Sequence, residues 1–111
     1  MIFLNISIKT NIILILKIVS NPQINWQNGQ PSGTIWASAC DFTNSDLSNA
    51  PTASNNCAST CQSTPGCTHF SWTTNNGGTC WMKKNSVSQS DAVYNGNTGM
   101  ICGIVPGMLF I

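Results

Sequence analysis

The chain has 111 residues, a length that fits one domain. Only 6% of them are charged and the formal net charge is +1, so the chain has no basic patch that could neutralise several phosphates. This composition argues against nucleic acid as a partner.

The first 20 residues are apolar but irregular. The uninterrupted apolar run from Ile12 to Leu16 is short, and Lys17 follows it directly. A membrane-spanning helix needs about 20 mostly apolar residues, so we expect no stable membrane span. The position of the segment and the small residue Ser20 favour a signal peptide or leader over residues 1–20. A mis-assigned start codon or a damaged leader is the alternative.

The next segments are a lead-in, a strand and a polar stretch. Residues 21–33 contain two prolines and two glycines, which predicts an irregular lead-in. Residues 34–42 alternate weakly between apolar and polar, which predicts a strand. Residues 43–52 are polar and are typical of turns.

Residues 54–63 form the best helix candidate. Ser54 is a suitable capping residue, and Cys57 and Cys61 are one helical turn apart on the same face. Pro65 and Gly66 end the segment. A helix this short does not persist alone, so we expect its cysteines to anchor it to the rest of the domain.

A hairpin follows the helix. Residues 68–74 and 79–84 have strand-like sequences, and the Asn-Asn-Gly-Gly segment at 75–78 is a strong turn signal between them. Residues 100–105 predict a closing strand, and 105–111 are a short apolar tail. The expected fold class is α+β, with one short α-helix packed across an antiparallel β-sheet.

All six cysteines lie between positions 40 and 102: Cys40, Cys57, Cys61, Cys67, Cys80 and Cys102. An even number of cysteines in a short chain indicates a disulfide framework and an oxidising, extracellular location. A unit of roughly 70 residues buries little apolar surface, so cross-links would offset its weak core. The spacing alone does not choose among the possible pairings.

The cysteine spacing resembles that of a known family. The run Cys57-x3-Cys61-x5-Cys67 is followed by an aromatic strand and by the Cys-Trp-Met-Lys segment at 80–83. Together with Cys40-Asp-Phe and Cys102-Gly, this resembles the six-cysteine apple form of the PAN/apple family over about residues 34–104.

The resemblance implies a small disulfide-rich PAN/apple-like fold with three bridges: Cys40–Cys102, Cys57–Cys80 and Cys61–Cys67. It also implies a secreted, non-catalytic module that binds an extracellular protein or a carbohydrate. A small secreted effector, such as a defence or toxin-like peptide, is the alternative function.

Other chemistries have weaker support. Four of the cysteines and His69 could in principle bind zinc, but two cysteines would then be left over. His69 has no carboxylate or nucleophile placed beside it by the sequence, so we interpret it as a strand residue. The sequence predicts neither a catalytic set nor a cofactor or metal site.

The aromatic residues provide the candidate ligand contacts. Phe70 and Trp72 share one face of their strand, and Trp81 and Lys83 share a face of the next. Burial in the core is one interpretation of these side chains. Because four tryptophans are many for a small core, we predict that Trp72, Trp81 and Lys83 contact a ligand.

Overall fold

The computed structural model describes residues 23–106. The predicted leader over residues 1–20 lies outside this range, as does most of the predicted tail. The elements in chain order are β1 (Gln27–Gly29), β2 (Thr34–Ser38), β3 (Cys40–Asp41), β4 (Asp46–Pro51), η1 (Ser54–Asn56), α2 (Cys57–Ser63), β5 (His69–Thr73), η2 (Asn75–Gly77), β6 (Thr79–Lys83), η3 (Gln89–Asp91), β7 (Val93–Tyr94) and β8 (Ile101–Ile104). Among the described residues, no helix is long and apolar enough to cross a membrane.

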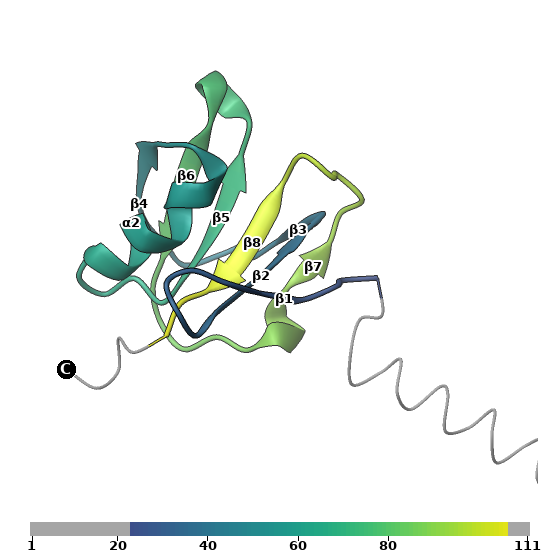
Figure 1. Ribbon diagram of the computed structural model, residues 1–111, viewed down its shortest axis with the longest axis horizontal. Helices are drawn as coiled ribbons and strands as arrows, with labels where there is room; N and C mark the ends of the chain where they lie inside the picture. Colours follow the sequence, from purple (N-terminus) through teal and green to yellow (C-terminus); the bar gives the residue numbers. More distant parts are fainter. Residues whose placement is uncertain (1–22, 107–111) are drawn as a thin grey trace, which may run out of the picture.

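The main sheet has six strands in the order β1-β2-β8-β5-β6-β4, and every neighbouring pair is antiparallel. The last strand of the chain, β8, lies between β2 and β5 near the middle of the sheet (Figure 1). The sheet therefore joins the two ends of the domain.

The short helix α2 covers one face of this sheet. Phe70 is paired with Met82 and Trp72 with Cys80, so these four side chains lie on that face together. A first core forms there around the helix residue Cys57 and the buried Phe70. The fold is therefore α+β: a small, disulfide-rich domain with an antiparallel sheet and one short helix packed across it.

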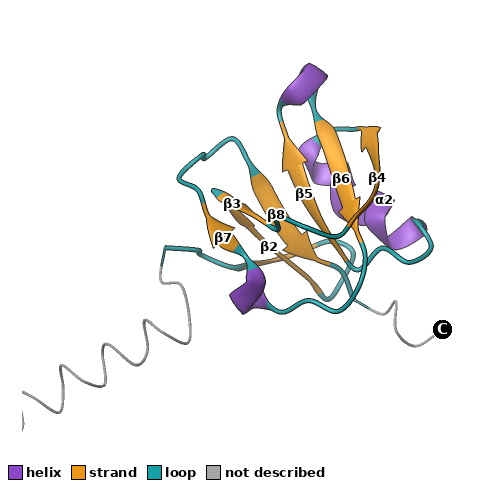
Figure 2. Ribbon diagram, turned by 180° about the vertical axis from the view of Figure 1, so that it is seen from behind, coloured by secondary structure: helices purple, strands orange, loops and turns teal. Residues whose placement is uncertain are grey.

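A two-stranded sheet of β3 and β7 lies on the opposite face (Figure 2). A second core forms here, around Phe42, Ala37 and Cys102. The Ser71 hydroxyl on β5 donates to an Asp41 carboxylate oxygen at 2.6 Å and accepts the backbone N–H of Phe42 at 3.2 Å. These two bonds attach β3 to the main sheet.

Three disulfides connect these layers: Cys40–Cys102, Cys57–Cys80 and Cys61–Cys67. They are the same three pairs that the family resemblance implied. The first joins the small sheet to β8, the second joins α2 to β6, and the third closes the end of α2 onto the chain that follows it. All six cysteines are fully buried, so the sulfur atoms form part of both cores.

Three local features differ from the sequence-based expectations. The lead-in contains the strand β1, and the polar stretch 43–52 contains the strand β4. Both are edge strands, which lack the hydrophobic alternation of a half-buried strand. Ser54 does not cap the helix with its side chain: η1 precedes α2, and neither has a side-chain cap. Thr60 and Ser59 instead donate their hydroxyls to the Asn56 carbonyl.

Candidate functional site

The two tryptophans predicted to contact a ligand lie on opposite faces of the main sheet. Trp72 is paired with Cys80 on the helix side, whereas Trp81 is paired with Ser71, the preceding residue of β5, on the other side. Each indole N–H is already bonded within the fold. Trp72 donates to the Thr52 carbonyl at 2.8 Å, and Trp81 donates to the Thr73 hydroxyl at 2.9 Å. The structure therefore does not bring these two side chains into one site.

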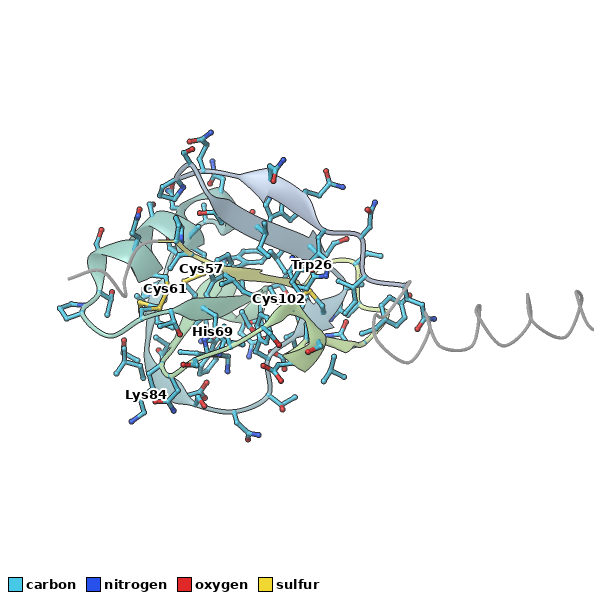
Figure 3. All side chains as sticks on the ribbon, turned by 90° about the horizontal axis from the view of Figure 1, so that it is seen from below. Trp26, Cys57, Cys61, His69, Lys84 and Cys102 are labelled. Carbon is cyan, nitrogen blue, oxygen red and sulfur yellow. A yellow bond between two sulfur atoms is a disulfide. The ribbon has the colours of Figure 1, made fainter. Side chains whose placement is uncertain are left out.

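Lys83, which the sequence predicted to be a ligand contact, is buried. Only 4% of the residue is exposed, and its ammonium group forms an ion pair with the carboxylate of Asp46 on the edge strand β4. A buried ammonium group needs such a partner, because burial without one is costly. The neighbouring Lys84 is exposed, and its side chain points away from the fold (Figure 3).

His69 is a buried strand residue, and its ring contacts Phe42 edge to face at 4.9 Å. The Thr68 hydroxyl donates to the Asn85 carbonyl at 2.6 Å and lies 2.8 Å from His69 Nδ1. Since that hydroxyl proton is engaged, His69 Nδ1–H donates to the Thr68 oxygen. Burial, assisted by the nearby Lys83 ammonium, lowers the pKa of His69 to about 4, although Asp91 and Asp46 oppose the shift.

This pKa predicts a loss of stability in mild acid. The unfolded chain binds a proton at His69 below about pH 6.5, whereas the folded protein does so only near pH 4. Stability from the neutral imidazole is therefore complete above pH 6.5 and declines as the pH falls toward 4. Between pH 6.5 and 5 we expect a decrease of about 2 kcal/mol in the free energy of unfolding. Urea titrations at several pH values measure it, and His69→Gln should flatten the profile in this interval. An unchanged slope in that variant would rule out His69 as the cause.

The alternative zinc site is not available. Its cysteine ligands, Cys57, Cys61, Cys67 and Cys80, are bonded to one another as disulfides. Within residues 23–106, no group of three or more His, Cys, Asp or Glu side chains is placed to hold a metal ion. The same oxidation removes any thiolate from a Cys-His nucleophilic pair.

A pocket of about 330 Å³ opens on the helix side of the sheet. We call it the helix–hairpin pocket. Its lining comes from three places: Ser54, Asn55 and Ala58 on η1 and α2; Gly29, Gln30 and Thr34 on the β1–β2 hairpin; and Trp36, Phe70 and Ile101 on the sheet. Figure 1 shows α2 in front of the sheet and the turn of the β1–β2 hairpin crossing in front of β8.

The pocket could not be predicted from the sequence, because no motif marks Trp36 or Asn55 as a lining residue. Trp36 and Phe70 are far apart in the sequence, and only the pairing of both β2 and β5 with β8 brings them together. No local pattern reports that pairing, so no periodicity could have found the pocket.

Comparison with known proteins gives one match. Residues 40–83 match a family model described as the PAN domain. No curated protein and no solved structure matches the chain. The matched segment runs from β3 to β6 and contains the helix, the hairpin and five of the six cysteines. The family match and the three disulfides agree with the fold described above and are consistent with an apple-like PAN domain.

Proposed function

We propose that this protein is a secreted, non-catalytic binding module that recognises an extracellular protein or a carbohydrate. The observation that carries the proposal is the PAN-domain match over a helix and hairpin held by disulfides. PAN domains are binding modules for proteins and carbohydrates. Three buried disulfides also suit an oxidising compartment outside the cell.

Two observations support a binding role. The protein has a pocket that could hold a ligand, and none of its cysteines is a free thiolate that could act as a nucleophile. The six sulfurs are bonded in pairs, and His69 is buried, neutral and bonded to Thr68. The helix–hairpin pocket is concave and mostly apolar with a few polar groups, which is typical of small-ligand sites. A small secreted effector remains the second candidate, because a disulfide-stapled fold of this size suits either role.

The test is binding that depends on the oxidised fold. The oxidised full chain is expected to bind saturably to members of a glycan array or to immobilised extracellular proteins. The same chain, reduced and alkylated, is the control and should lose this binding, because the bridges hold both cores together. Equal binding by the two forms, or none by either, would contradict the proposal. Growth inhibition of cells by the oxidised chain without such binding would favour the effector instead.

A further inference from the structure

Covalent and backbone constraints hold the sides of the helix–hairpin pocket. The Cys57–Cys80 disulfide attaches the helix side to β6. The pairing of Gly29 with Thr34 closes the hairpin side. Phe70 lies over Gly103, where an added Cβ would be 2.4 Å from the ring. Pockets that are already formed in the free protein bind ligands without an ordering cost.

Trp36 lines the pocket with an indole that remains available to a ligand. The residue is half-buried. Unlike the N–H groups of Trp72 and Trp81, its indole N–H donates to none of the residues that the structure describes. An aromatic wall that still has a free donor provides both a stacking surface and a polar contact.

Thr34, which also lines the pocket, has an unsatisfied hydrogen-bonding group. It is only 1% exposed, and its hydroxyl oxygen has no hydrogen-bond partner among residues 23–106. Most buried polar groups in folded proteins are paired, and an unpaired one costs about 1–3 kcal/mol. An orphaned hydroxyl on a residue that lines a pocket indicates a ligand that supplies the missing partner.

The lining selects a neutral ligand with an apolar face. None of the nine lining residues is charged. Gln30 and Asn55 are exposed, on opposite sides of the pocket, and their amides both donate and accept hydrogen bonds. An aromatic wall surrounded by amides and hydroxyls suits a pyranose ring, whose C–H face is apolar and whose edge carries hydroxyls. A peptide side chain would leave most of these polar groups without partners.

We propose that the helix–hairpin pocket binds one residue of a neutral glycan, stacked on Trp36 and hydrogen-bonded to Asn55, Gln30 and Thr34. This inference rests on the proposed function and makes it specific. A pocket of about 330 Å³ is at the small end of the range for ligand sites, which suits a single sugar residue. The absence of charge from the lining argues against sulfated or carboxylated sugars.

The first experiment locates the ligand. The oxidised, ¹⁵N-labelled full chain is titrated with methyl glycosides of glucose, galactose, mannose and N-acetylglucosamine, and two-dimensional NMR spectra are recorded. We expect at least one glycoside to shift the Trp36 indole and the Asn55 and Gln30 side-chain signals saturably. Glucuronic acid is the charged control and should bind more weakly than glucose. N-acetyltyrosine amide tests the peptide alternative: if it alone occupies the pocket, the proposal is overturned.

The second experiment uses matched variants with the best glycoside. Asn55→Ala should weaken binding about fivefold, the loss expected for one hydrogen bond. Asn56→Ala changes the next residue of η1, which is also exposed but does not line the pocket, and should leave the affinity unchanged. Trp36→Phe keeps an aromatic wall but removes the N–H, and should weaken binding less than Trp36→Ala.

Thr34→Val distinguishes a ligand contact from a structural role. Because the hydroxyl has no partner in the free protein, its removal should leave the urea midpoint unchanged or raise it. The same variant should weaken glycoside binding about fivefold. A lowered midpoint with unchanged affinity would overturn the role of Thr34.

The outcomes separate this inference from the proposed function. If Asn55→Ala, Trp36→Ala and Thr34→Val all bind normally, the pocket is not the site, although oxidation-dependent binding on the array still supports a binding module. If no neutral glycoside produces saturable shifts at the pocket, the inference is overturned in the same way. If the oxidised chain binds nothing on the array or among the extracellular proteins, the proposed function itself fails.

Discussion

Replacing Cys40 and Cys102 together by alanine is expected to destabilise the domain more than removing either of the other bridges. The reason is the length of chain that each bridge closes, since a longer loop restricts the unfolded state more. The sequence separations are 62, 23 and 6 residues for the bridges that begin at Cys40, Cys57 and Cys61, respectively. The loop-entropy model gives about 4, about 3 and about 2 kcal/mol for them.

The structure adds a reason for the same order. Cys40 and Cys102 are fully buried in the second core, and their bond joins the small sheet to the central strand β8. A small domain has a net stability of about 5–15 kcal/mol, so a loss of about 4 kcal/mol is a large share of it. Without this bridge, the burial of Phe42 between the two sheets depends on non-covalent contacts alone.

Urea unfolding of the three double-alanine variants measures these losses. The variant that lacks Cys61 and Cys67 is the matched control. It also loses a buried bridge, but that bridge closes the shortest of the three loops. We expect its unfolding midpoint to be nearest that of the parent chain. If it is destabilised as much as the Cys40→Ala/Cys102→Ala variant, loop closure does not determine the contribution of these bridges.

The second large effect is expected at the ion pair of Lys83 and Asp46. Asp46→Asn should lower the free energy of unfolding by about 3 kcal/mol, because it leaves a buried ammonium group without its anion. The Lys83 side chain is 5% exposed, whereas that of Asp46 is 59% exposed. Removal of the Asp46 charge therefore lowers the free energy of unfolding more than the exposure of Asp46 alone would suggest.

Lys83→Met is the informative comparison. Methionine retains an apolar stem of similar length and removes the charge that required compensation, so this variant should cost about 1 kcal/mol or less. In the double variant, Asp46→Asn should add little further loss, because no buried charge remains. Chemical denaturation at pH 7, where His69 is neutral, measures all three variants. A larger loss for Lys83→Met than for Asp46→Asn would show that packing of the stem outweighs the charge.

Several features of this protein follow from short stretches of sequence. Cys57 and Cys61 share a helix face because an α-helix repeats every 3.6 residues. The hairpin follows from two β-favouring runs on either side of the Asn-Asn-Gly-Gly segment, where Asn76 and Gly77 have positive φ. These patterns predicted the α+β class, and the cysteine spacing supplied the family resemblance. The helix and the hairpin depend only on residues that are close in the chain.

Other features depend on contacts that no local pattern contains. Lys83 alternates with Met82 as an exposed strand residue should, yet the edge strand β4 brings Asp46 beside it and the lysine is buried. Trp72 and Trp81 looked alike in the sequence but lie on opposite faces, each with its N–H bonded within the fold. The polar strand β4 gave no hydrophobic signal, so the burial of Lys83 could not be predicted.

The helix–hairpin pocket is the clearest case of this division. Its walls come from β1 and β2, from the helix, and from the late strand β8, which are separated along most of the described chain. Trp36 and Thr34 acquire their significance only when β8 inserts between β2 and β5. The local sequence therefore determined the helix, the hairpin and the positions of the six cysteines. The long-range strand pairing decided which side chains are buried, which are paired and which line the pocket, because burial depends on neighbours in space.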